Sequence, residues 1–131
     1  MKVLICGGRD LNKADAWNLL EREAKDEIAH AIGCFNGVKI ETVIHGGCRG
    51  ADEAAAAWGA SEHAKVIACP ADWKKHGKAA GPMRNRRMLL DHKPDIVIAL
   101  PGGRGTADMI RQAEAEGVRV VRLPILSERV L

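Results

Sequence analysis

The chain has 131 residues, of which 47% are hydrophobic, enough for one compact domain with a single core. Its 20 basic and 17 acidic residues give a net charge of +3, which argues only weakly for a nucleic-acid partner. No stretch approaches the roughly 20 apolar residues that span a bilayer, and the amino terminus has no signal-peptide pattern. We therefore expect one soluble, cytoplasmic domain over residues 1–131, with no membrane partner.

Five short apolar runs alternate along the chain with segments that suit helices. We expect strands at residues 2–6, 41–45, 65–69, 95–100 and 119–123, and helices at about residues 13–32, 51–62, 81–92 and 107–116. Continuous apolar runs are typical of parallel strands that are covered on both faces. Because connections between parallel strands are right-handed, this order predicts an α/β, Rossmann-like fold: a doubly wound five-stranded sheet of order 3-2-1-4-5 with helices on both faces.

Three glycine-rich turns follow expected strands. They contain Gly7, Gly8 and Arg9 after the first strand, Gly46, Gly47, Arg49 and Asp52 after the second, and Gly102, Gly103, Arg104, Gly105 and Thr106 after the fourth. The carboxyl ends of parallel strands share one edge of the sheet. In this strand order the first and third of these turns face each other across a crevice, and the second flanks it.

This edge suits a ligand that carries phosphate and sugar groups. Glycines let a backbone approach a ligand closely, and the free N–H groups of a first helical turn bind phosphate. We expect the turn after the fourth strand to cradle a phosphate, with Arg9 and Arg84 neutralising its charge. Asp52 either holds a ribose hydroxyl or is a favourable first-turn acid. The alternative for the glycines is that they serve only the geometry of tight turns.

The longest irregular segment, residues 70–82, is basic and leads into a basic helix. Between Asp72 and Arg87 the sequence has six lysines and arginines against one aspartate. Arg84, followed by Asn85, is expected in the first turn of that helix, where a cation opposes the helix dipole unless an anion offsets it. The lysines either attract an anion or form a solvated face, and Trp73 either stacks on a base or covers the edge of the core.

The four cysteines lack the paired spacing of a zinc finger, and we interpret them as reduced residues of the core. We expect no metal and no cofactor. The alternative is a zinc site built from Cys6, His45 and Cys48, which this fold would bring toward one sheet edge.

Four segments carry a family resemblance through their order and spacing: residues 5–9, 46–52, 81–86 and 103–109. Together they resemble the SLOG superfamily of Rossmann-like nucleotide-binding proteins, and in particular its small YspA-like branch. The resemblance implies binding of a nucleotide-like small molecule. It also implies a homodimer formed through helices beside the site.

Within that superfamily, the LOG-type phosphoribohydrolases release a base from a nucleoside 5'-monophosphate. Their pattern PGGxGTxxE is similar to residues 101–109 here, but its glutamate falls on Met109. The catalytic arginine of that class is matched by Arg84, and the lysine beside it is replaced by Asn85. Asp108 is the nearest acid, although it points about 100° around a helix from position 109.

Three functions remain open, in this order of preference. The first is binding of a nucleoside monophosphate, an ADP-ribose-like ligand or a nucleotide sugar. The second is hydrolysis of an N-glycosidic bond, with Arg84 holding the phosphate and Asp108 or Asp10 acting at the ribose. The third is binding of single-stranded nucleic acid by the basic segment and Trp73, against which the aromatic content of 3% counts.

Overall fold

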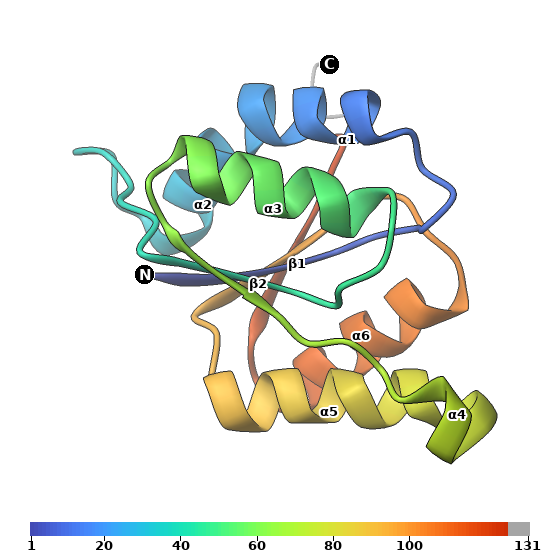
Figure 1. The fold of residues 1–131 in the computed structure, drawn as a ribbon. Coiled ribbons are helices and arrows are strands. Elements are labelled where there is room, and N and C mark those ends of the chain that lie inside the picture. Colours follow the sequence, from blue (N-terminus) through green and yellow to red (C-terminus); the bar gives the residue numbers. More distant parts are fainter. Residues whose placement is uncertain (126–131) are drawn as a thin grey trace.

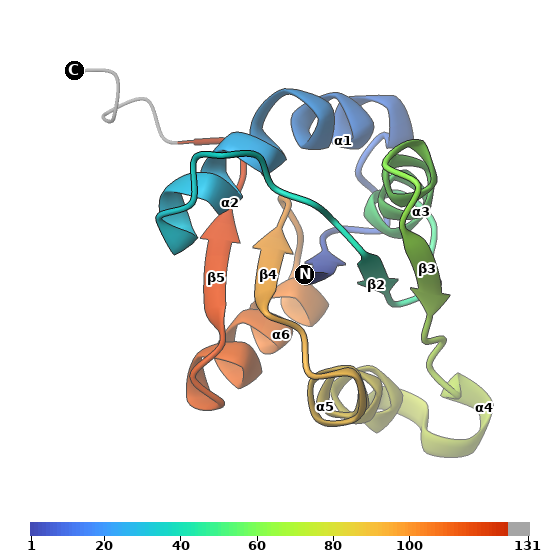
Figure 2. The same cartoon turned by 90° about the vertical axis from the view of Figure 1, so that its left-hand side faces the viewer.

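The computed structural model describes residues 1–125. Its strands form one parallel sheet of order β3-β2-β1-β4-β5 (Figures 1 and 2). The strands are β1 (Lys2–Cys6), β2 (Thr42–His45), β3 (Lys65–Ala68), β4 (Ile96–Ala99) and β5 (Arg119–Arg122). The predicted fold class and strand order are confirmed.

The three central strands are apolar because both of their faces are covered. Successive side chains of β1 point to opposite faces, so Val3 and Ile5 enter one apolar cluster and Leu4 enters the other. Each of these three side chains is fully buried. The edge strands β3 and β5 have exposed ends and only half-buried centres. This is the burial pattern that the continuous apolar runs predict for a doubly covered sheet.

Helices cover both faces of the sheet, as predicted. One layer consists of α1 (Lys13–Leu19), the π-helical turn η1 (Leu20–Ala24), α2 (Lys25–Ile32) and α3 (Ala51–Ser61). The other layer consists of α5 (Ala80–His92) and α6 (Arg104–Ala115). Figure 1 shows the two layers above and below the strands. No helix in the described part of the chain has an apolar stretch long enough to cross a bilayer.

The first helical run has the bounds that the sequence predicts, but its centre is π-helical. It begins after Asn12, whose side chain accepts hydrogen bonds from the N–H groups of Ala14 and Asp15. It ends at Gly33, which has a φ of 69°. Leu20 in the π-helical turn is fully buried. Leu20, Ala24 and Ile28, at helical spacing in the sequence, are all fully buried, and this spacing does not indicate the change of helix type.

Two segments differ from the expectation by more than a one-residue shift at the end of an element. The segment at 70–82 is not irregular throughout: it contains the short helix α4 (Trp73–His76) and the 3-10 turn η2 (Gly77–Ala79), and α5 already begins at Ala80. The Asp72 side chain caps α4 by accepting the N–H of Lys75 at 3.1 Å. Helix α6 begins three residues earlier than expected, so Gly105 and Thr106 are helical residues and not part of a loop.

Candidate functional site

The turns that follow β1 and β4 are in direct contact. The N–H of Gly8 donates to the carbonyl of Pro101 at 2.8 Å, and the Gly8 carbonyl accepts the N–H of Ala51 at 3.2 Å. A Cβ atom on Gly102 would lie 2.7 Å from the Gly8 nitrogen, so this close packing requires glycine. The two turns meet as the strand order predicts, but at Gly8 and Gly102 they pack together and leave no crevice between them.

The turn after β2 ends at the amino end of α3, where its backbone donors are used within the protein. The Glu53 carboxylate accepts the N–H of Gly50 at 2.9 Å, and the Asp52 carboxylate accepts the N–H of Cys48 at 3.0 Å. Asp52 is 7% exposed. Its contacts are those of a first-turn acid, which is the structural one of its two expected roles.

The amino end of α6 is left more open. Its N-cap residue is Gly103, no side chain caps it, and its first turn contains no acid. In this turn Arg104 and Gly105 are exposed, whereas Thr106 is buried. A twelve-residue helix with such an end carries a partial positive charge at N–H groups that an anion can reach.

The 14 glycines of the chain, all within residues 1–125, fall into two groups. Twelve of them have either a positive φ or an atom within 3.4 Å of the position of a Cβ. Gly103 and Gly105 have neither, because a Cβ on each would meet no atom within 4 Å. The packing of the protein therefore gives no reason for the missing side chains at these two positions, which flank the open helix end.

A buried network of hydrogen-bonded polar side chains connects the amino end of α6 to the turn after β2. The Arg84 guanidinium donates from Nη1 to the Gly46 carbonyl at 2.7 Å and from Nε to Asn85 Oδ1 at 3.0 Å. Asn85 Nδ2 donates to the Gly105 carbonyl at 3.2 Å and to the Asp108 carboxylate at 2.9 Å. Arg84 lies in the second turn of α5 and not in its first as expected, because α5 begins at Ala80.

Asp108 and Met109 both point away from the open helix end. The Asp108 carboxylate is 9% exposed and also accepts from Arg111 Nη2 at 2.6 Å and from Gln112 Nε2 at 2.8 Å. Met109 is 1% exposed and packs in the apolar cluster beneath the sheet. The position that carries a glutamate in the LOG-type pattern therefore faces the core.

Buried titratable groups lie beneath the turn after β2. The N–H of Gly47 donates to Nδ1 of His45 at 3.0 Å. Burial lowers the pKa of His45 and raises the pKa of Asp52, and burial with the nearby Asp52 raises the pKa of the Cys6 thiol to about 12. Within residues 1–125 no three His, Cys, Asp or Glu side chains are placed to share a metal ion, the arrangement that the zinc alternative needs. The sequence pattern indicates His45 only as a possible zinc ligand, and no signal in it predicts the bond to Gly47.

The remaining predicted residues lie at the rim. Arg49 is tied to the turn after β1, since its Nη2 lies 2.8 Å from Asp10 Oδ1 and its Nε donates to the Arg9 carbonyl at 3.2 Å. Arg9 itself is exposed. The Trp73 ring lies over Gly81 at the start of α5 and remains 49% exposed, so it partly covers the protein and partly faces solvent.

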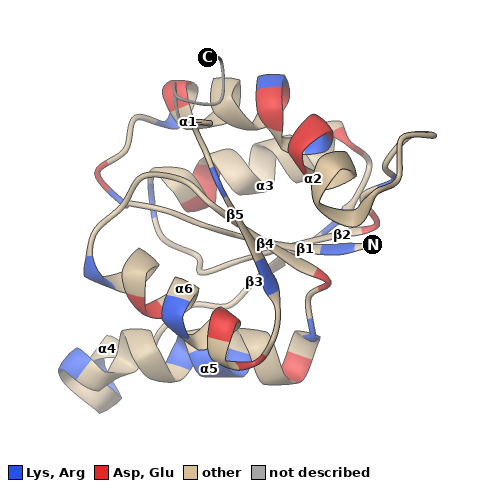
Figure 3. Ribbon diagram, turned by 180° about the vertical axis from the view of Figure 1, so that it is seen from behind, with Lys and Arg blue, Asp and Glu red and all other residues tan. Residues whose placement is uncertain are grey.

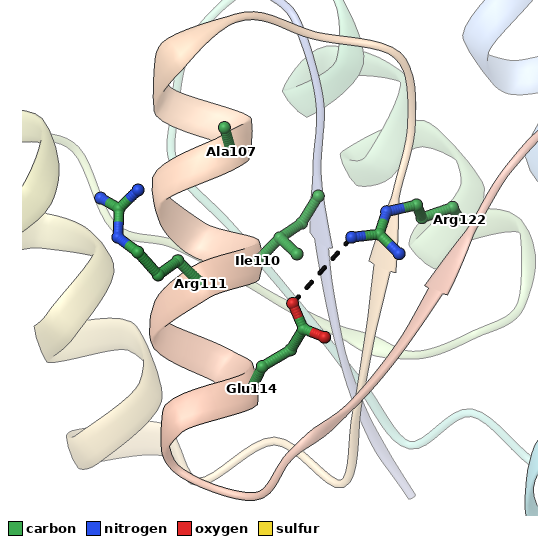
Figure 4. A pocket seen from close by; sticks show the side chains of 5 residues that line it. All are labelled: Ala107, Ile110, Arg111, Glu114 and Arg122. Atoms are coloured by element: carbon green, nitrogen blue, oxygen red, sulfur yellow. Dashed lines mark ion pairs between the residues drawn. The ribbon is translucent and has the colours of Figure 1, made fainter.

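Two further hollows are present in the described part of the chain. One, of about 300 Å³, is on α6 beside β5, where Glu114 and Arg122 approach to 4.0 Å and Arg111 points toward the opposite side of the helix (Figure 4). The other, of about 390 Å³, is lined by α2 and by Phe35 and Val38 in the segment that follows it. Neither hollow is lined by a residue of the predicted site.

Comparison with known proteins assigns the chain to a family. Residues 1–76 match the family described as "YspA, cpYpsA-related SLOG family", and the chain belongs to this family. The matched region includes the turns after β1 and β2 and ends with α4, so it does not reach the turn after β4. The chain is also similar to the gene 61 protein of Mycobacterium phage D29, with 40% identity over 86 residues, which cover 60% of this chain and 68% of that protein.

Proposed function

We propose that the protein binds a nucleotide or another phosphorylated ribosyl ligand, with a phosphate at the amino end of α6. The observation that carries this proposal is the pair Gly103 and Gly105, which lack side chains without a reason in the protein's own packing. A phosphate that contacts the backbone N–H groups of the first turn would supply that reason. Membership of a SLOG family supports a nucleotide-related ligand.

The charges around the helix end suit an anion. Arg104 is exposed in the first turn of α6, and Arg9 is exposed in the turn after β1, whose Gly8 contacts Pro101 shortly before that helix. Arg84 holds a third positive charge beneath the edge. Its hydrogen bonds within residues 1–125 use Nε and Nη1, so Nη2 is the nitrogen that it offers to a ligand phosphate. A guanidinium in this position adds charge without needing to move.

The hydrolase alternative gains no support from Asp108. A carboxylate that assists cleavage at the ribose must be free to approach the anomeric carbon or a water molecule. Both oxygens of Asp108 already accept hydrogen bonds, from Asn85 on α5 and from Arg111 and Gln112 on α6 itself. Asp10 is exposed but is paired with Arg49.

The homodimer that the resemblance implies stays a prediction.

The proposal is tested by matched ligands and matched variants. Thermal unfolding is followed with AMP, ADP-ribose and, as the control without phosphate, adenosine. A ligand at about 100 times its dissociation constant adds roughly 2.7 kcal/mol of stability. We expect stabilisation by the phosphorylated compounds and little by adenosine. Mass spectrometry of the same samples shows whether a free base and ribose phosphate are released, which would establish the hydrolase alternative.

Two leucine variants of α6 locate the site. Gly105→Leu places a side chain where the phosphate is proposed to lie, and the open space there lets the variant fold. Ala107→Leu adds a side chain at an exposed position of the same helix and serves as the control. We expect Gly105→Leu to lose nucleotide binding and Ala107→Leu to keep it. Unchanged AMP affinity in Gly105→Leu, or no stabilisation of the wild type by any nucleotide, would overturn the proposal.

A further inference from the structure

The charge of this protein is distributed unevenly. Residues 73–90, here called the basic segment, contain six lysines and arginines and no acid, whereas the rest of the chain has fourteen basic and seventeen acidic residues. The net charge of +3 is therefore the sum of a strongly positive segment and a remainder of the chain that is net negative. Figure 3 shows this segment as blue stretches on α4 and along α5.

Most of these cations lie on the surface of the folded protein. Five of the six are exposed: Lys74, Lys75, Lys78, Arg86 and Arg87. None of the five has an ion pair with a partner in residues 1–125. Asp72, the residue before the segment, is used as the helix cap of α4. Since like charges this close together repel each other, a bound polyanion would stabilise the arrangement.

The basic segment adjoins the proposed nucleotide site at two points. Pro70, which precedes it, lies against Gly47, where a Cβ would be 3.4 Å from the proline Cα. Arg84 and Asn85 within the segment bond to the carbonyls of Gly46 and Gly105. A ligand that starts at the amino end of α6 can therefore continue over α5 and α4.

An exposed aromatic ring lies among these charges. Trp73 begins α4 and is 49% exposed, with part of its ring resting on Gly81. An aromatic ring that is half exposed offers a surface on which an unpaired base can stack. Bases in a duplex are already stacked and do not present this face.

We propose that the basic segment binds single-stranded nucleic acid, with backbone phosphates on its lysines and arginines and a base on Trp73. The choice of nucleic acid over other polyanions rests on the proposed function, because the segment adjoins the nucleotide site. The surface itself is a separate binding region. It extends the ligand class from a single nucleotide to a nucleotide within a strand.

Two charge-matched variants test the surface. Lys74→Glu/Lys75→Glu/Lys78→Glu reverses three exposed charges of the basic segment. Lys39→Glu/Lys65→Glu/Lys93→Glu makes the same change in net charge at exposed positions before or at the start of β2, β3 and β4, at the opposite edge of the sheet. Binding of a fluorescent 12-nucleotide oligothymidylate is measured by anisotropy over a range of salt concentrations. We expect the first variant to bind about tenfold or more weakly, with a salt slope smaller by about 2, and the second to retain most of the affinity.

Trp73 gives a second readout. Its fluorescence should be quenched by the oligonucleotide, and Trp73→Ala should weaken binding about fivefold or more, whereas Trp73→Phe should keep most of the affinity. An equal affinity for duplex DNA without quenching would overturn the single-strand assignment. Equal loss in the two charge variants, or binding to phosphatidylserine vesicles without binding to the oligonucleotide, would overturn the nucleic-acid assignment. AMP binding, measured in parallel, shows separately whether the nucleotide site exists.

Discussion

The backbone N–H of Gly47 donates a hydrogen bond to Nδ1 of His45 at 3.0 Å. His45 is the last residue of β2 and is 7% exposed. A ring nitrogen that accepts a hydrogen bond carries no proton, so this contact requires the neutral imidazole. The geometry of the turn, in which Gly47 has a φ of 74°, is therefore coupled to the protonation state of His45.

This coupling predicts a loss of stability in acid. Burial lowers the pKa of His45 from its ordinary value of 6.5, Asp52 opposes the shift and Arg84 adds to it. A depressed pKa in the folded state means that the stabilising contribution is complete above about pH 6.5 and is lost as the pH falls toward the folded-state pKa. We expect the urea concentration at the unfolding midpoint of the wild type to decrease as the pH is lowered from 7.5 to 5.

His45→Asn is the comparison for this prediction. The asparagine oxygen can accept the Gly47 N–H in place of Nδ1, and it does not titrate. The variant should lose less stability over the same pH range. Asp52 has a raised pKa and so contributes the opposite pH dependence, but it is present in both proteins. An equal fall of the urea midpoint in both would contradict the role of His45.

Two glycine variants should shift the stability of the protein in opposite directions. A Cβ on Gly7 would lie 2.6 Å from Ala51 Cβ and 2.9 Å from Leu100 Cβ, so Gly7→Ala overpacks the core and should cost about 1–3 kcal/mol. Gly105→Ala meets no neighbour and places a better helix former in α6, so it should stabilise by up to about 1 kcal/mol. Urea unfolding without ligand measures both, and destabilisation by Gly105→Ala would mean that this glycine has a structural role.

Restoring the glutamate of the LOG-type pattern at position 109 should damage the fold instead of creating a catalyst. Met109 is 1% exposed and lies among Leu4, Met88 and Val97. A carboxylate in that apolar cluster has no partner, so Met109→Glu should lose more than about 3 kcal/mol of stability. Circular dichroism during thermal unfolding measures the loss.

Met109→Leu is the control, since a swap of similar volume should cost less than about 1.5 kcal/mol. If Met109→Glu instead folds like the wild type and releases a base from AMP, position 109 faces the ligand and the description of its surroundings is wrong.

The sequence was sufficient to predict the fold because its signals are local. The apolar runs identify strands that are covered on both faces, and the handedness of the connections then limits the strand order. Asn12 and Gly33 mark the two ends of the first helical run for the same reason, because capping depends on the residues beside a helix end. The short helix α4 was missed, although Asp72 followed by Trp73 and Lys74 is compatible with a capped helical turn.

The sequence also predicted that the glycine turns share one edge of the sheet. Parallel strands that end in glycine turns bring those turns to one edge in any sheet of this order. The contact between Gly8 and Pro101 bears this out. The matched variants of α6 test whether a ligand binds there.

What only the tertiary structure decided is which of the similar residues serve the fold and which remain available. Gly7 and Gly105 look alike in the sequence, yet one packs against Ala51 and Leu100 while the other faces open space. Asp108 is a plausible acid by position, yet its carboxylate accepts a hydrogen bond from Asn85 on another helix. The physical reason is that backbone conformation depends mainly on neighbours in sequence, whereas burial, charge pairing and close packing depend on residues that are distant in the chain and adjacent only after folding.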